Sequence, residues 1–448
     1  MRQYFETGIT KPYAFRKAQL NKLKATVLKY EQAINDALYK DLKRSPEETW
    51  ITETGFLLAE ISYALKHLKS WMKPETVGTN LLNIPSKSYL VKEPIGTVLI
   101  IGPWNYPLQL LLTPLVGAIA AGNCVVLKAS EFAPATSGIV KQIIEEAFDK
   151  KYILFTTGEG AVIIPEMMNN FIFDHVFYTG STTVGKIIYQ MAAKSLVPVT
   201  LELGGKSPCI VEEDADITVA AKRIAMAKFS NAGQICVAPD YVLVHASKKT
   251  AFIDALKISI VKFLGEDARH SYDFGRIIND KQFDRLQKYL QQGTVLFGGQ
   301  TDKTQLYIAP ALLGDVSMES PIMREEIFGP ILPIIPFTTS AEAKEIVKKN
   351  PNPLAFYIFT SSNKKEKEWI ENIPFGGGCV NNAVMHLTNH NLPFGGRGAS
   401  GTGSYHGKFS FNTFTHNKGI LKTPAWFDPN VKYPSYKGKL KIFKWLMK

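Results

Sequence analysis

The sequence is poor in cysteine and has no apolar leader segment. Four cysteines in 448 residues are too few for a disulfide scaffold, and they suit a reducing compartment in which thiols stay free. The first twenty residues contain no apolar core of the kind that a secretory signal needs, so we expect a cytoplasmic protein. With 45% hydrophobic and 21% charged residues, the composition excludes a largely disordered chain, a coiled coil and a collagen-like repeat.

Charged residues are missing from one long stretch, which runs from Gly96 to Leu127. Its length exceeds the ~20 residues that a membrane-spanning helix needs. A single helix is excluded because three prolines would each remove a backbone hydrogen bond: Pro103, Pro107 and Pro114. The stretch is better explained by a strand, a turn, a helix and a second strand, which together form a βαβ unit with buried strands.

Alternation of short apolar strands with helical stretches predicts two doubly wound α/β domains. Residues 14–42 and 53–71 have helical periodicity and precede the first domain. The strands expected in the first domain are 97–101, 124–128, 152–157, 175–179 and 198–203. A second alternating run begins after Gly205, and a Gly- and Asn-rich segment that we expect to be a loop begins at Gly376.

The net charge of +12 is partly local, because five lysines lie in the last twelve residues. No long basic stripe occurs elsewhere, so we expect no nucleic-acid partner. In the tail, lysines alternate with Leu440, Phe443, Trp445 and Met447. This pattern suits a weak peripheral contact with an anionic membrane. A solvated tail, or one packed against another subunit, explains it equally well.

Polar side chains follow the ends of the expected strands, where ligands bind in open α/β sheets. The polar residues are Asn105, Lys128, Glu131, Ser181 and Glu202, and Gly180 directly precedes Ser181. Lys128 and Glu131 can bind ribose hydroxyls, although an ordinary solvated ion pair explains them equally well. Gly180 allows a phosphate to approach the start of the next helix. No GxGxxG motif is present, and Gly180 with Gly185 is a weak substitute.

Two further motifs resemble known sites but lack essential residues. The LGGKS segment at 203–207 has Thr200 where a P-loop needs glycine, and Pro208 follows in place of a helix, so an NTPase is excluded. His386 and His390 have helical spacing, but Leu387 occupies the position at which a zinc protease needs glutamate. We therefore expect no metal site.

Cys236 differs from the other cysteines because it lies in a loop between a helix and a strand, flanked by small residues. For a single cysteine, an inert structural role would be the better explanation. The presence of Glu202 and Asn105 on the predicted sheet edge favours covalent catalysis. A thiolate can attack a carbonyl carbon, an amide N–H can hold the oxyanion, and a carboxylate can activate water. Each such oxyanion donor typically lowers the barrier by ~3 kcal/mol.

Seven ordered motifs carry a resemblance to the aldehyde dehydrogenase superfamily, and most closely to its class 3 and fatty-aldehyde branch. They are GPWNYP (102–107), LKASE (127–131), YTGSTTVG (178–185), LELGGKSP (201–208), GQICVAPDY (233–241), EEIFGP (325–330) and LPFGGRGASGTG (392–403). The segment SYHGKFSF (404–411) points to the class 3 branch. The resemblance extends from about residue 15 to residue 422.

The resemblance implies roles for individual residues. Cys236 matches the family's nucleophile, Glu202 the general base and Asn105 the oxyanion-hole amide. The positions that match the family's NAD or NADP site are Lys128 and Glu131 for the adenosine ribose, Gly180, Ser181 and Gly185 for the phosphate turn, and Glu326 and Phe328 for the nicotinamide end. The implied activity is oxidation of an aldehyde to a carboxylic acid through a thiohemiacetal and a thioester.

The resemblance also implies a domain organisation. N-terminal helices and an atypical Rossmann cofactor domain would occupy residues 1–205, and the catalytic domain residues 206–380. A return segment, a bridging arm that pairs subunits into a homodimer, and the basic tail would occupy residues 381–448.

The sequence departs from the family's motifs at two positions, and two alternative functions remain open. Ala129 replaces the family's usual proline, and Glu159 is added near the expected ribose site, which leaves the choice between NAD and NADP open. A CoA-acylating dehydrogenase is the alternative enzyme, although Glu202 argues against it because thiolysis needs no water-activating base. A binding protein that kept the fold without activity is the alternative outside enzymes.

Overall fold

The computed structural model describes residues 1–447, and it opens with a group of helices that matches the expected N-terminal helical region. They are α1 (Arg2–Glu6), α2 (Tyr13–Lys29), α3 (Glu31–Leu42), α4 (Pro46–Thr49) and α5 (Gly55–Trp71). The predicted helix 14–42 is divided at Tyr30 into α2 and α3. A π-helical turn at Trp50–Thr54 leads into α5, and such turns are frequent at functional sites.

The first sheet has six strands in the order β17-β7-β6-β3-β4-β5. Its strands are β3 (Thr97–Ile101), β4 (Cys124–Lys128), β5 (Ile153–Thr156), β6 (His175–Thr179), β7 (Val199–Glu202) and β17 (Gly401–Thr402). The first five are parallel, as predicted, and β17 adds an antiparallel edge. Separate apolar cores cover the two faces. The helices around them are α6 (Gln109–Ala121), α7 (Pro134–Ala147), α8 (Gly160–Asn170) and α9 (Thr182–Ala193).

The uncharged stretch forms β3, α6 and β4, so the predicted βαβ unit is confirmed. Every residue of α6 is buried, which explains why the helix carries no charge. Among residues 1–447, no helix combines the length and apolarity needed to cross a membrane.

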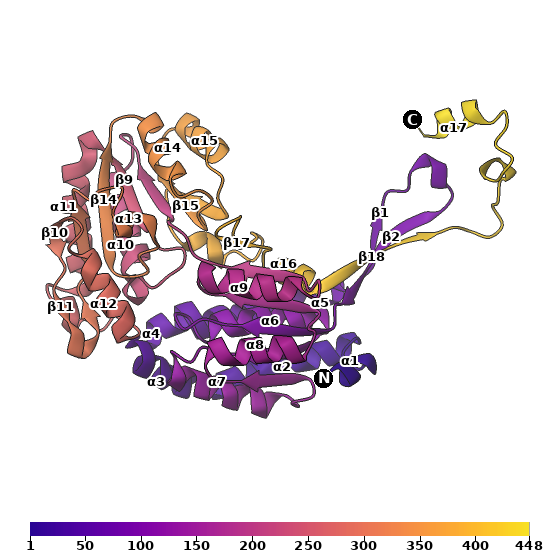
Figure 1. Ribbon diagram of the computed structural model, residues 1–448, viewed down its shortest axis with the longest axis horizontal. Helices are drawn as coiled ribbons and strands as arrows, with labels where there is room; N and C mark the ends of the chain where they lie inside the picture. The colour runs from indigo at the N-terminus through magenta and orange to yellow at the C-terminus, as the bar shows by residue number, and fades with distance from the viewer. Residues whose placement is uncertain (448) are drawn as a thin grey trace.

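The second sheet has seven strands in the order β10-β13-β14-β9-β8-β15-β16 and forms the lobe at the left of Figure 1. Its strands are β8 (Pro208–Val211), β9 (Tyr241–His245), β10 (Thr294–Gly298), β13 (Ala311–Gly314), β14 (Ile331–Phe337), β15 (Ala355–Phe359) and β16 (Gly377–Val380). Its helices include α10 (Ile217–Phe229), α11 (Lys249–Leu264), α12 (Asp280–Tyr289), α14 (Ser340–Lys348) and α15 (Asn363–Asn372). The two doubly wound α/β domains are thus confirmed.

The Gly-rich segment differs from expectation at its start, because Gly377–Val380 forms strand β16 and not a loop. Gly378 pairs with Phe356 of β15, and a Cβ there would collide with the carbonyl of Phe356. The glycine allows this close approach of the two backbones, so the residue that made the segment look like a loop permits the strand.

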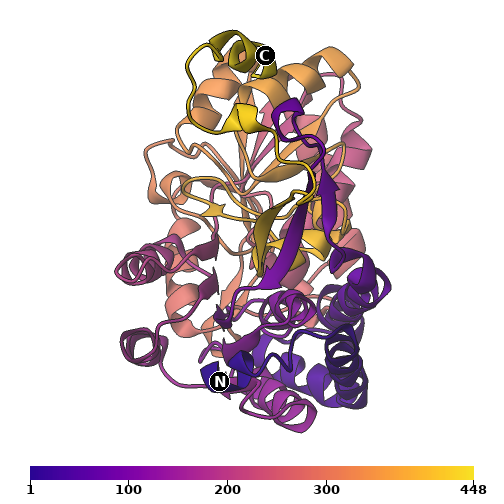
Figure 2. The same cartoon turned by 90° about the vertical axis from the view of Figure 1, so that its right-hand side faces the viewer.

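An arm projects from the body as a three-stranded antiparallel sheet (Figures 1 and 2). It contains β1 (Glu75–Val77), β2 (Lys87–Pro94) and β18 (Thr415–Lys422), and β18 pairs with β2 along eight residues. The arm therefore also uses residues 75–94, which lie within the stretch 1–205 expected to form the N-terminal helices and the cofactor domain. The chain then continues to α17 (Leu440–Leu446) near the tip.

Candidate active site

The carboxyl ends of β3, β6 and β7 open into a cleft of about 670 Å³, where the structure brings most of the predicted site residues together. The predicted residues that line it are Asn105, Gly180, Ser181, Glu202, Cys236, Glu326 and Phe328. The proposed nucleophile, base and oxyanion amide thus share one cleft, although they come from three separate segments of the chain.

Cys236 lies at the junction of this cleft with a second cavity of about 230 Å³. The loop before it turns sharply, with positive φ at Asn231, Ala232 and Gly233. A Cβ at Gly233 would collide with the carbonyl of Gly329, so a glycine is required where the two loops touch. Burial, together with the nearby charges of Glu326 and Glu202, raises the pKa of the Cys236 thiol. The resting thiol is therefore neutral, and its proton needs an acceptor.

Glu202 is the last residue of β7 and is 2% exposed. Within residues 1–447, neither of its carboxylate oxygens has a hydrogen-bond partner. Burial raises the pKa of this carboxyl well above its usual value. An unpaired buried carboxylate is costly, and such groups occur mainly where function requires them. A raised pKa also brings the group closer to the range in which a general base works near neutral pH.

Asn105 follows β3 and is buried. Its side-chain Nδ2 donates a hydrogen bond of 3.0 Å to the main-chain oxygen of Gln234, two residues before Cys236. An amide NH₂ carries two hydrogens, so the second N–H is left for a ligand in the cleft. The position of this donor is therefore coupled to the loop that carries the thiol.

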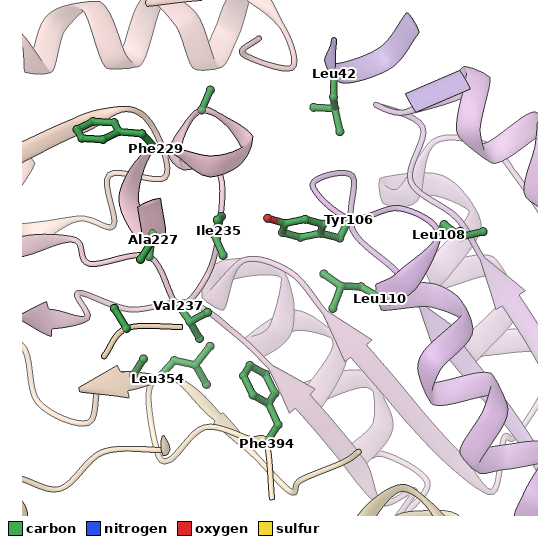
Figure 3. Packing of buried hydrophobic residues seen from close by; sticks show 14 of the residues in the cluster. Leu42, Tyr106, Leu108, Leu110, Ala227, Phe229, Ile235, Val237, Leu354 and Phe394 are labelled. Carbon is green, nitrogen blue, oxygen red and sulfur yellow. The ribbon is translucent and has the colours of Figure 1, made fainter. Parts of the chain in front are cut away.

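The second cavity is lined mainly by apolar side chains. They include Ile51, Phe56, Tyr106, Met226, Ile235 and Leu387. Figure 3 shows Tyr106, Leu110, Ile235 and Phe394 directed toward a shared space from different elements. Leu110, Cys236, Phe394 and Tyr405 line both cavities, so the thiol is accessible from two sides.

Lys128, the last residue of β4, forms an ion pair with Glu131 outside the cleft that holds Cys236. Lys128 Nζ lies 2.7 Å from Glu131 Oε2, and Glu131 Oε1 accepts a 2.9 Å hydrogen bond from Gly160 N. Burial acts to raise the pKa of Glu131, but these two donors outweigh it and lower the pKa. Because Lys128 is only 2% exposed, the pair is not an ordinary solvated one.

Gly180, Ser181 and Gly185 shape the start of α9. Ser181 caps the helix by accepting a hydrogen bond from Val184 N. A Cβ at Gly180 would collide with the Tyr178 hydroxyl, and one at Gly185 with Leu203. The N-terminus of α9 therefore sits close against β6 and β7, with Thr182 and Thr183 lining the cleft. Free N–H groups at such a terminus favour an anion.

The 325–330 loop brings Glu326 and Phe328 into the lining of the same cleft. Phe328 has a positive φ, and its ring packs edge-on against Trp104 at 5.3 Å. Burial and the nearby Asp240 raise the pKa of Glu326 to about 8. Lys206 pairs with Asp240 and donates to the carbonyl of Glu325 at 2.9 Å. The lysine of the P-loop-like motif thus braces this loop.

His386 and His390 face different partners. His390 Nδ1 lies 2.8 Å from a carboxylate oxygen of Glu60, whereas His386 Nδ1 lies 3.6 Å from the sulfur of Cys379. Their spacing of four residues therefore does not bring them to one ligand.

Two buried cations near the site were not predicted from the sequence. Lys228 on α10 is fully buried, has no hydrogen-bond partner for Nζ within residues 1–447, and has a pKa that burial lowers to about 8. Its position among the apolar residues at the end of the helix (Ile224–Ala227 and Phe229) was the signal that could have identified it. Arg44 is also fully buried, and nothing in its local sequence indicates its partners.

Known proteins resemble this chain over nearly its whole length. The family model described as "Aldehyde dehydrogenase family" matches residues 2–420. The 4,4'-diaponeurosporen-aldehyde dehydrogenase of Staphylococcus aureus is 48% identical over 98% of this chain and 96% of its own length. Aldehyde dehydrogenase family 3 member B1 of Homo sapiens is 44% identical over 97% and 93%, respectively.

Solved structures agree as well. A substrate-bound state of Staphylococcus aureus AldH superposes with a TM-score of 0.97 at 47% identity, covering 100% of this chain and 98% of that chain. An indole-3-acetaldehyde dehydrogenase in complex with NAD+ superposes with a TM-score of 0.86 at 26% identity, covering 94% and 87%. The resemblance found in the motifs is confirmed, and the chain belongs to the aldehyde dehydrogenase family, whose members are oxidoreductases that act on aldehydes.

Proposed function

We propose that this chain oxidises an apolar aldehyde to a carboxylic acid with NAD or NADP, using Cys236 as the nucleophile. The observation that supports this most is the position of the thiol, between an apolar cavity and a cleft lined by Asn105 and Glu202. An aldehyde with an apolar chain would occupy the first space, and the cofactor would occupy the second. The direct test is aldehyde-dependent NAD(P)H formation with a carboxylic acid as product.

The first chemical step is attack of the Cys236 thiolate on the aldehyde carbon. The thiol proton passes to solvent, and a C–S bond forms as the carbonyl oxygen becomes an oxyanion. The free N–H of the Asn105 side chain and the Cys236 main-chain N–H hold this oxyanion. The bound dinucleotide supplies the hydride acceptor for the oxidation, which leaves a thioester on Cys236.

Hydrolysis of the thioester completes the cycle. Glu202, in its ionised form, takes a proton from water, and the resulting hydroxide adds to the acyl carbon. The C–S bond then breaks, the thiolate leaves and the carboxylic acid is released. In a CoA-acylating enzyme a thiol would take the place of water, and the buried, unpartnered carboxylate would have no such role. Formation of the free acid both with and without CoA distinguishes hydrolysis from thiolysis.

The chain's residues fit a dinucleotide. Lys128 and the charged Glu131 would hold the adenosine ribose, and the open N-terminus of α9 would face the pyrophosphate. Glu326 and Phe328 would hold the nicotinamide end beside Cys236, because all three line the same cleft. The complex of the indole-3-acetaldehyde dehydrogenase with NAD+ supports a dinucleotide as the cofactor.

Replacing Glu131 by glutamine tests the ribose site. The loss of a charged acceptor is expected to raise the KM for NAD about tenfold or more, since hydrogen bonds to charged groups contribute roughly 1.5–3 kcal/mol. The kcat should change little, because Glu131 lies outside the cleft that holds Cys236. Steady-state kinetics with NAD and NADP measure both effects. The control is Glu146→Gln, which breaks an exposed pair with Lys29. Equal KM values in both variants would contradict the assignment.

The arm and tail support a proposal for assembly and location. We propose a cytoplasmic homodimer that pairs through the three-stranded arm, in agreement with the four free thiols and the projection of the arm from the body. The tail keeps its apolar side chains exposed, with Leu440 at 63%, Trp445 at 65% and Met447 at 76%. Interleaved lysines make this surface suitable for weak contact with anionic lipid.

Truncation after Pro434 tests the membrane contact. The full chain is expected to co-sediment with vesicles that contain anionic lipid, and the truncated chain to remain in solution. The difference should shrink at high salt, because ions screen the attraction between lysines and lipid headgroups. Sedimentation velocity of both forms controls for a change in subunit association. Equal partitioning of the two forms would rule out the contact.

A further inference from the structure

One buried arginine from the N-terminal helical region contacts the loop that carries Cys236 and the loop that carries Asn105. Arg44 follows α3 and is fully buried. Its Nε donates to the side-chain oxygen of Asn231 at 2.9 Å, and its Nη2 donates to the main-chain oxygen of Asn105. Asn231 lies in the loop 230–240, which carries Cys236 and is called the nucleophile loop here. Asn105 lies in the loop 102–108, which is called the oxyanion loop. One guanidinium therefore contacts both loops.

The third contact of Arg44 leads back to the oxyanion loop. Its Nη1 donates to Glu53 Oε1 at 2.8 Å, and Glu53 is also fully buried. The other oxygen of Glu53 accepts from the main-chain N–H groups of Leu108 at 3.2 Å and Gln109 at 2.7 Å. These groups lie where the oxyanion loop joins α6, and Arg44 also lies 4.4 Å above the ring of Tyr106. The ion pair therefore holds the segment on both sides of Tyr106.

The hydrogen bonds of Arg44 continue through Asn231 to the Asn105 side chain. Asn231 Nδ2 donates at 3.1 Å to the main-chain oxygens of both Asn105 and Gln234. The Asn105 side chain donates to the same Gln234 oxygen. The orientation of the amide relative to Cys236 thus depends on Asn231, and Arg44 fixes the side-chain oxygen of Asn231. Errors of about 1 Å in catalytic geometry can reduce rates about 10²-fold.

We propose that Arg44 is a positioning residue that holds the Asn105 amide in working geometry relative to Cys236. The proposal rests on the oxyanion role proposed for Asn105. Lysine would keep the positive charge but not the planar fork of donors that reaches three acceptors at once. Arg44→Lys is therefore expected to weaken oxyanion stabilisation while leaving the thiol in place.

Two reactions of Cys236 without cofactor distinguish positioning from general damage. Acylation by 4-nitrophenyl acetate forms a C–S bond, expels nitrophenolate and passes through an oxyanion, whereas alkylation by iodoacetamide expels iodide without one. In Arg44→Lys, acylation is expected to slow about 10- to 100-fold, with alkylation unchanged within about twofold. The matched control is Arg16→Lys, since Arg16 is a buried arginine that donates to Thr10 O and Ala120 O away from the cleft. Equal slowing of both reactions would overturn the proposal.

A double-mutant cycle with Asn105→Ala tests whether Arg44 acts through the amide. Once the amide is absent, Arg44→Lys is expected to slow acylation by less than about twofold more. The same fold-loss in both backgrounds would refute positioning. If Asn105→Ala alone leaves acylation unchanged, the oxyanion role fails and not the network. Should Arg44→Lys fail to fold, Glu53→Gln removes the charge of its partner and is expected to show the same selective loss.

Discussion

Cys236→Ala is expected to abolish aldehyde-dependent NAD(P)H formation, with a loss of at least about 10⁴-fold, as for removal of other catalytic nucleophiles. The physical reason is that no other nucleophile would replace the thiol where the cleft and the apolar cavity meet. Cofactor affinity should be nearly unchanged, because the substitution removes only one sulfur atom. Stopped-flow detection of NAD(P)H and a separate cofactor titration measure the two quantities.

Cys379→Ala is the control for this experiment. Cys379 is also a partly exposed free thiol, but its sulfur lies 3.6 Å from His386 and lines neither cavity. Its replacement should leave turnover within about twofold of the original enzyme. Full turnover in Cys236→Ala would refute the covalent mechanism, whatever the behaviour of the control.

The second large effect is expected for Glu202→Gln, which keeps the size of the side chain but removes the base. Thioester hydrolysis should slow about 10²- to 10⁴-fold, the usual contribution of general-base catalysis. A first turnover of NAD(P)H should still be visible, followed by a much slower steady state. Rapid-mixing kinetics separate these phases. An unchanged steady-state rate would show that another group activates water.

The pH dependence of the steady state provides a second readout for Glu202. Burial raises the pKa of this carboxyl well above its usual value. Because only the ionised form accepts a proton, turnover should fall as the pH falls through that raised pKa. It should recover as the pH rises. In Glu202→Gln the dependence due to this group should disappear. A profile identical in both proteins would contradict its role as the base.

The strands of the first sheet could be predicted because parallel strands covered on both faces are apolar throughout. The predicted bounds of β3, β4 and β6 agree with the structure. Strand β16 could not be predicted, because its glycines have low strand propensity and only its packing against β15 stabilises it. Strand β2 of the arm contains both polar and apolar residues and pairs with β18, more than 300 residues away. The residue pattern within either strand does not predict which distant strand it pairs with.

Some residues of the candidate site could likewise be predicted from the sequence, and others could not. Asn105 and Glu202 follow from strand ends, since the carboxyl edge of the sheet collects ligand-binding residues. Cys236 could be singled out by its loop and by the presence of Glu202 and Asn105, but its distance from them could not be predicted, because its loop belongs to the second domain. Arg44 and Asn231 are 187 positions apart. Their hydrogen bond depends on the packing of the N-terminal helices against the nucleophile loop, which sequence periodicity does not specify.

Acid quenching of the Glu202→Gln enzyme during turnover with an aldehyde and NAD(P)+, followed by peptide mass spectrometry, tests the central claim most directly. The proposed mechanism predicts one acyl group, with the mass of the oxidised aldehyde, on the peptide that contains Cys236. Hydroxylamine should remove the group, as expected for a thioester. Unmodified Cys236 during full NAD(P)H formation, or an acyl group on another residue, would contradict the mechanism.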